Sequence, residues 1–181
     1  EALSVTDNDD LLFAACALLK RITKIEIDDE SEELQCIETS YGDIVAMLVD
    51  VMSAVDSPDC VSDEAWEPYI AAYETLHVVA EIAADLIAEN MKEVIAGLLQ
   101  NENFAERDAG LKLLECIIEF TTAPLEMKEF IAAAIELLGD DAQCVKHGAL
   151  KCIRKGLERI AEVNKEDEAL VQIAGTADEL A

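Results

Sequence analysis

Two side chains in one helical stretch have the spacing of a metal-ligand pair. Glu74 and His77 lie three residues apart, which is how di-iron carboxylate proteins ligate metal from a single helix. Such a site needs a second pair and further glutamates. The other histidine, His147, has Cys144 where its partner glutamate would stand. We therefore interpret His77 as an ordinary helical histidine and predict no metal and no other cofactor.

Motifs of covalent catalysis are missing as well. The sequence contains neither a nucleophile elbow nor a glycine-rich phosphate loop. Carboxylate pairs are so abundant that each one is uninformative. We expect that the protein is not an enzyme.

The single tryptophan, Trp66, stands in a segment rich in carboxylates. An indole face attracts Lys and Arg cations, and neighbouring carboxylates can pair with the same cations. The alternative is a tryptophan that closes an apolar seam between helices. On the first interpretation, we predict that basic protein segments are bound by Asp56, Asp59, Asp63, Glu64, Trp66, Glu67, Asp85 and Glu89.

Charge is the strongest feature of the composition. Asp and Glu number 40 against 13 Lys and Arg, which gives a formal net charge of −27. Residues 25–91 contain no Lys or Arg but eighteen carboxylates. Such a field repels nucleic acid and anionic lipid and attracts basic proteins, although an acidic surface also simply keeps a protein in solution. Near the C-terminus, Lys151, Arg154, Lys155 and Arg159 are interpreted as a solvated helix face.

The cysteines do not have the spacing of a metal site or of a redox motif. No C-x-x-C occurs, and most stand among apolar residues. We expect buried free thiols in a reducing compartment, at Cys16, Cys36, Cys60, Cys116, Cys144 and Cys152. No leader and no apolar run of about 20 residues is recognised, so we expect no membrane span. Because both ends fall in helical sequence, we expect a piece of a longer chain.

The elements that position these residues are predicted to be helix pairs. Pairs of small residues are followed, four places later, by a large aliphatic residue, and the pairs recur at intervals of 57, 38 and 39 residues. Small residues let two helices approach closely, and a residue four places on shares their face. The pairs are Ala14-Ala15, Ala71-Ala72, Ala109-Gly110 and Gly148-Ala149.

Amphipathic patterns around these pairs predict an all-α fold. We expect helices at about 8–26, 40–55, 66–83, 85–100, 104–120, 124–138 and 142–162, with a weak partner at 165–180. Repeats of about 40 residues have the length of HEAT or armadillo units. The prediction is one α-solenoid over 1–181 with about four HEAT-type pairs, at 8–55, 66–100, 104–138 and 142–180, and acidic insertions at 27–39 and 56–64.

Three segments together resemble the importin-β (karyopherin-β) family. The stretch from Ser62 to Ala72 is similar to its acidic loop, where acids precede a Trp, a Pro two places on and a small pair, although here the acids are spread rather than contiguous. Asn103 to Gly110 resembles the family's N-x-x-x-x-R-D-A-A helix start, and Cys144 to Ala149 its V-x-x-A pattern. The order and spacing extend over residues 1–162.

This resemblance implies a nuclear transport receptor. Members bind the basic helix of an importin-α-type adaptor, or basic cargo, on an acidic inner face and release it when Ran-GTP binds. They cross pores by holding Phe-Gly nucleoporins, and they shuttle between cytoplasm and nucleus through the nuclear envelope. Trp66 matches a tryptophan that stacks on basic side chains in the family. The acidic face would come from the second helix of each pair, with Asp43, Asp50, Asp85, Glu89 and Glu93.

Two other functions stay open from the residues. One is a general HEAT-repeat scaffold for a multiprotein complex. The other is a metal-dependent four-helix enzyme, which elemental analysis for iron or manganese tests.

Overall fold

Helices make up the regular structure of the protein. The computed structural model describes residues 9–28, 35–55, 67–121 and 124–163, and within these ranges there are seven α-helices and no strand, as predicted. The predicted partial helix at 165–180 and the predicted insertion at 56–64 lie outside the described residues. The elements are α1 (Asp9–Asp28), α2 (Cys36–Ser53), α3 (Glu67–Asn90), α4 (Lys92–Leu99), α5 (Phe104–Phe120), α6 (Pro124–Glu136), the 3₁₀-helix η3 (Leu137–Gly139) and α7 (Gln143–Val163).

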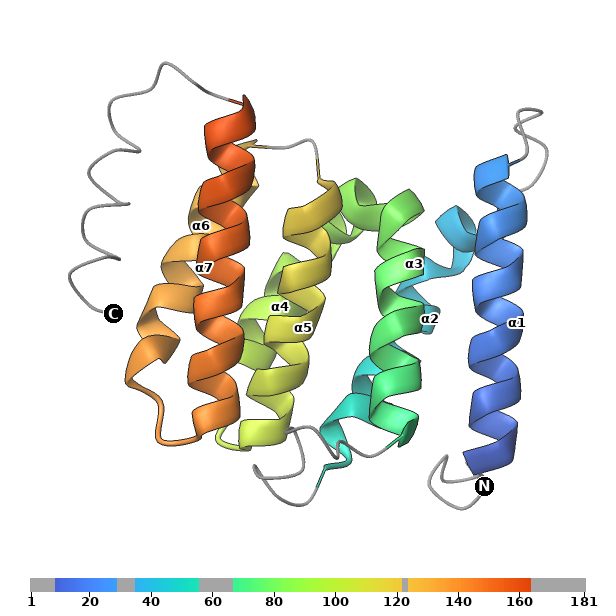
Figure 1. The fold of residues 1–181 in the computed structure, drawn as a ribbon, viewed down its shortest axis with the longest axis horizontal. Helices are drawn as coiled ribbons and strands as arrows, with labels where there is room; N and C mark the ends of the chain where they lie inside the picture. Colours follow the sequence, from blue (N-terminus) through green and yellow to red (C-terminus); the bar gives the residue numbers. More distant parts are fainter. Residues whose placement is uncertain (1–8, 29–34, 56–66, 122–123, 164–181) are drawn as a thin grey trace.

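Alternate helices share a layer. Figure 1 shows α1, α3, α5 and α7 side by side and running in the same direction, with α2, α4 and α6 behind them. Each helix of the rear layer packs mainly on the front helix that follows it in sequence: α2 on α3, α4 on α5 and α6 on α7. One continuous apolar core lies between the layers.

Glycines permit the closest helix contacts, as the small-pair pattern predicted. A Cβ at Gly110 would lie 2.9 Å from the Leu98 Cβ of α4. A Cβ at Gly148 would lie 3.2 Å from the Leu111 Cδ1 of α5. At Gly156, which the pattern missed, a Cβ would lie 2.6 Å from the Ile131 side chain of α6. The backbones therefore approach more closely than side chains at these positions would allow.

The first small pair does not serve this purpose. Ala14 is exposed and Ala15 half-buried, because α1 is the edge helix of the front layer and packs chiefly on α3. Its unpacked side also exposes Leu11, Leu18 and Ile25, spaced seven residues apart.

Helix α5 is the centre of the molecule. It contacts α3 and α7 in its own layer and α2 and α4 in the layer behind. None of its 17 residues is exposed. Even the charged residues Asp108, Lys112 and Glu115 are buried, so each needs polar partners close by, either within α5 or from the helices around it.

Two predicted helix boundaries are wrong. The break expected between 83 and 85 falls instead at Met91, because Ala83, Ala84, Ile87 and Ala88 continue the buried face of α3 without a glycine or proline. Helix α2 begins at Cys36 rather than at residue 40, so residues 27–28 and 36–39 of the expected insertion belong to helices.

A side chain from α1 explains where α2 begins. Gln35 precedes α2 without a side-chain capping bond. The carboxylate of Glu26 takes that role instead, since it accepts hydrogen bonds from the backbone N–H groups of Cys36 and Ile37, the latter at 3.1 Å to Oε2. An anion at a helix N-terminus is stabilised by the free N–H groups and by the helix dipole.

The residues that carry the family resemblance near α5 have structural roles. Asn103 caps α5, and its side chain accepts the Ala105 N–H at 3.0 Å. Arg107 binds both carboxylate oxygens of Asp140, at 2.7 and 3.0 Å, and donates to the Asn101 and Glu102 carbonyls. This fork joins the turn before α5 to the turn before α7.

Candidate functional site

The predicted binding residues divide into two groups. Asp56, Asp59, Asp63, Glu64 and Trp66 lie outside the described residues. Glu67, Asp85 and Glu89 all lie on the exposed side of α3. Asp85 and Glu89 were expected on the second helix of a pair. That placement is wrong, because α3 continues to Asn90 and carries both of them in the front layer.

The exposed side of α3 is almost entirely acidic. Its exposed residues are five carboxylates together with Ile70 and Asn90. Intervals of seven, seven, four and four residues keep the carboxylates on one face of a helix with 3.6 residues per turn, over roughly 33 Å at 1.5 Å per residue. We call this face the acidic ridge: Glu67, Glu74, Glu81, Asp85 and Glu89.

Sequence analysis missed Glu74 and Glu81 as members of this surface. The signal was present, since both continue the heptad that begins at Glu67. All three also lie within the helix expected at 66–83, but the expected break placed Asp85 and Glu89 on another element, so the five acids were not considered as one row.

Most of the acidic ridge is open to an incoming cation. Glu74 is paired with Lys20 of α1 at 2.7 Å, and Asp85 accepts a hydrogen bond from the Thr121 hydroxyl at 2.6 Å. Glu67, Glu81 and Glu89 form no ion pair with any residue in the described ranges. Carboxylates without ion pairs at three places along one face give a negative potential that attracts Lys and Arg side chains.

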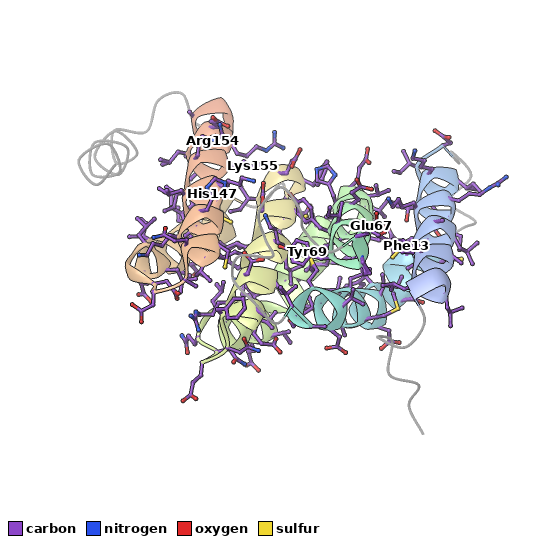
Figure 2. The ribbon with its side chains drawn as sticks, turned by 60° about the horizontal axis from the view of Figure 1, so that its bottom comes forward. Phe13, Glu67, Tyr69, His147, Arg154 and Lys155 are labelled. Carbon is purple, nitrogen blue, oxygen red and sulfur yellow. The ribbon has the colours of Figure 1, made fainter. Side chains whose placement is uncertain are left out.

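A groove adjoins one end of the ridge. It lies between α1 and α3 and has a volume of about 570 Å³. Figure 2 shows Phe13 and Glu67 at this junction. Its lining combines an apolar floor with charged ends: Phe13, Cys16, Ala17, Lys20, Glu67, Ile70, Ala71 and Glu74.

A charged seam crosses from α3 over α5 to α7. Lys155 of α7 contacts Glu119 and lies 3.5 Å from the Glu115 Oε1. His77 of α3 lies 3.0 Å from Glu119 and packs edge-on against Phe120 at 4.9 Å between ring centroids. Lys155 therefore belongs to an internal ion network, and its interpretation as part of a solvated face is wrong. Arg154 on the same helix is exposed, as expected (Figure 2).

The pKa shifts in the seam follow from these pairs. Burial opposes the charged form of Glu119, but the Lys155 ammonium and then His77 hold the pKa of Glu119 below its usual range. Burial likewise opposes the charge of Lys155, and Glu119 and Glu115 outweigh it and raise the pKa of Lys155. The seam is a self-compensated structural network, which leaves little charge for a partner.

One carboxylate beneath the seam is less well compensated. The Tyr69 hydroxyl donates to the Asp108 Oδ2 at 2.5 Å, while the Asp108 Oδ1 is buried and has no hydrogen-bond partner in the part of the chain that the structure describes. Burial raises the pKa of Asp108, although the Tyr69 hydrogen bond and Lys112 lower it in part. Burial, and then the Asp108 charge, also raise the pKa of Tyr69. This pair joins α3 to α5 in the core.

The prediction of buried free thiols is confirmed for most of the cysteines that the structure describes. Cys16, Cys116 and Cys152 are buried free thiols, and Cys144 is half-buried. Cys36 is exposed, which contradicts its predicted burial, because it begins α2 at the surface. Cys60 lies outside the described residues. Burial raises the pKa values of Cys116 and Cys152, so neither behaves as a nucleophile.

The described ranges hold no group of three or more His, Cys, Asp or Glu side chains arranged to bind a metal ion. None of their helices combines the length and the apolar character needed to cross a bilayer.

Comparison with known proteins yields no relative. No family description, no curated protein and no solved structure matches this chain.

Proposed function

We propose that this chain is a protein-binding module that recognises basic segments of its partners along the acidic ridge. The observation that carries this proposal is the row of five exposed carboxylates on α3, three of them without an ion-pair partner in the described ranges. Basic segments are the partners of opposite charge. The long-range field would speed encounter, and individual pairs would set specificity.

The proposal extends to the architecture. The alternation of helices between two layers around one shared core supports a HEAT-type solenoid, in which stacked helix pairs share a core. Together with the sequence resemblance, this arrangement favours a fragment of an importin-β-like transport receptor. An importin-α-type adaptor or basic cargo would then be the ligand, and Ran-GTP and Phe-Gly nucleoporins would be further partners.

Calorimetric titration with an importin-α-type basic adaptor peptide tests the function. We expect binding at low salt that weakens at physiological salt, where the Debye length is about 8 Å. The variant Glu67→Gln/Glu81→Gln/Glu89→Gln should lose roughly threefold to a hundredfold in low-salt affinity, since each exposed charge pair contributes about 0.2–1 kcal/mol.

The matched control removes three exposed carboxylates elsewhere, as Glu102→Gln/Glu136→Gln/Glu158→Gln. It has the same net charge as the ridge variant, so an equal loss in both would show a general charge effect and not a site. No binding by the wild type at low salt would contradict the transport function and leave a general HEAT-repeat scaffold as the alternative.

A further inference from the structure

The groove between α1 and α3 has two chemically different ends. Glu74 at one end is neutralised by Lys20, with the Lys20 Nζ 2.7 Å from the Glu74 Oε2. Glu67 lies at the other end, exposed and without an ion pair in the described ranges. Seven residues of helix separate the two carboxylates by about 10.5 Å. One end of the groove is therefore anionic and the other is not.

Apolar side chains line the groove between these two ends. Phe13 of α1 and Ile70 of α3 both line the groove. Ile70 is 41% exposed and is the one apolar residue among the exposed residues of α3. A large apolar side chain in the middle of an acidic face leaves apolar surface in water, and a ligand group that covers it gains affinity.

We propose that this groove takes one bulky apolar side chain of a partner segment whose neighbouring Lys or Arg pairs with Glu67. The proposal rests on the proposed function and makes it specific: the ligand is a basic segment with an apolar anchor, not any polycation. Charge complementarity selects this occupant. An acidic or uncharged apolar segment would place no cation beside Glu67, and an acidic one would be repelled by the ridge.

The test uses two peptides of equal positive charge that differ only by a leucine or a serine at one position between lysines. Calorimetry at low salt measures both against the wild-type chain. Burying a leucine side chain should favour the leucine peptide by roughly tenfold to a hundredfold.

Filling the groove should abolish this preference. Ala17 is an exposed residue of α1 that lines the groove, and Ala14 is an exposed residue of the same helix that does not. We expect Ala17→Leu to bind both peptides equally and Ala14→Leu to keep the wild-type preference. Glu67→Gln should weaken both peptides and leave their ratio unchanged. Helix content from circular dichroism verifies that each variant is folded.

The outcomes separate the two proposals. If the wild type binds both peptides equally, or if Ala17→Leu keeps the preference, the groove proposal is overturned while binding of basic segments stands. If neither peptide binds the wild type at low salt, both proposals are overturned.

Discussion

At the scale of single residues, buried charge is concentrated where α5 meets its neighbours. Asp108 has one oxygen bonded to the Tyr69 hydroxyl and the other without a partner in the described ranges. Lys112 lies over the Tyr73 ring at 4.9 Å and 3.7 Å from Glu115. Charges with few or distant partners cost folding free energy, and a group can reduce this cost by changing its protonation.

Asp108 is therefore predicted to weaken the fold as pH rises. Its folded pKa is raised by burial, so its contribution to stability is fully present below the unfolded pKa and is lost as pH rises through the folded pKa. Asp108→Asn has no charge to lose and still accepts the Tyr69 hydroxyl. We expect its stability relative to the wild type to improve from pH 4 toward pH 7, measured by urea unfolding.

Tyr69→Phe is the comparison for this prediction. It removes the donor and leaves Asp108 with no hydrogen bond, so it should destabilise the chain by about 1–3 kcal/mol near neutral pH. If the free energies of unfolding of the wild type and Asp108→Asn changed in parallel with pH, Asp108 would titrate alike in the folded and unfolded chains, and the prediction would be wrong.

The candidate site was only partly predictable from single residues. Glu67, Asp85 and Glu89 could be predicted as binding residues because negative charge is a property of the residue itself. The ion pairing of Glu74 and Lys155 was not predictable, because their partners, Lys20 and Glu119, are 54 and 36 residues away. Such distances are set by packing and have no local signal.

At the scale of elements, local patterns predicted the helices better than their ends. The apolar stripes of α5 and α7 are periodic over many turns and were placed within a residue or two. The division of α3 from α4 failed because it was expected at residue 84, where the buried stripe continues through Ile87 and Ala88. The start of α2 failed because its capping carboxylate, Glu26, comes from another helix.

Two glycines in neighbouring helices should respond oppositely to the same change. A Cβ at Gly110 meets the Leu98 Cβ at 2.9 Å, while a Cβ at Gly97 meets nothing within 4 Å. We expect Gly110→Ala to destabilise the chain by about 1 kcal/mol net, since overpacking costs about 1–3 kcal/mol and outweighs the helix propensity gained.

The exposed Gly97→Ala should instead stabilise the chain by up to about 1 kcal/mol from propensity alone. Denaturant midpoints of the two variants and the wild type measure both effects. A stabilised Gly110→Ala would mean that α4 and α5 are less closely packed than described.

At the scale of the whole molecule, like charge dominates. A net charge of −27 opposes compaction, and the acidic ridge concentrates part of it on one helix. We expect added sodium chloride to raise the melting temperature, because salt screens repulsion between exposed carboxylates. Differential scanning calorimetry over a salt series measures this effect.

The ridge variant Glu67→Gln/Glu81→Gln/Glu89→Gln should show a smaller salt effect than the wild type. The ion pairs of Lys155 are half-buried. Salt should therefore weaken their attraction less than it weakens the repulsion between the exposed ridge carboxylates. A melting temperature that falls with salt would mean that attractive pairs, and not repulsion, govern the surface.

The burial of α5 also bears on how this sequence can change over generations. A helix with no exposed position has no site where a substitution meets only water. Each accepted change in α5 must suit side chains of α2, α3, α4 or α7 at the same time, so its residues are expected to vary in step with partners far along the chain. Exposed positions of α1 such as Leu18 and Ile25 contact fewer of the described helices, so they are expected to vary more independently than the residues of α5.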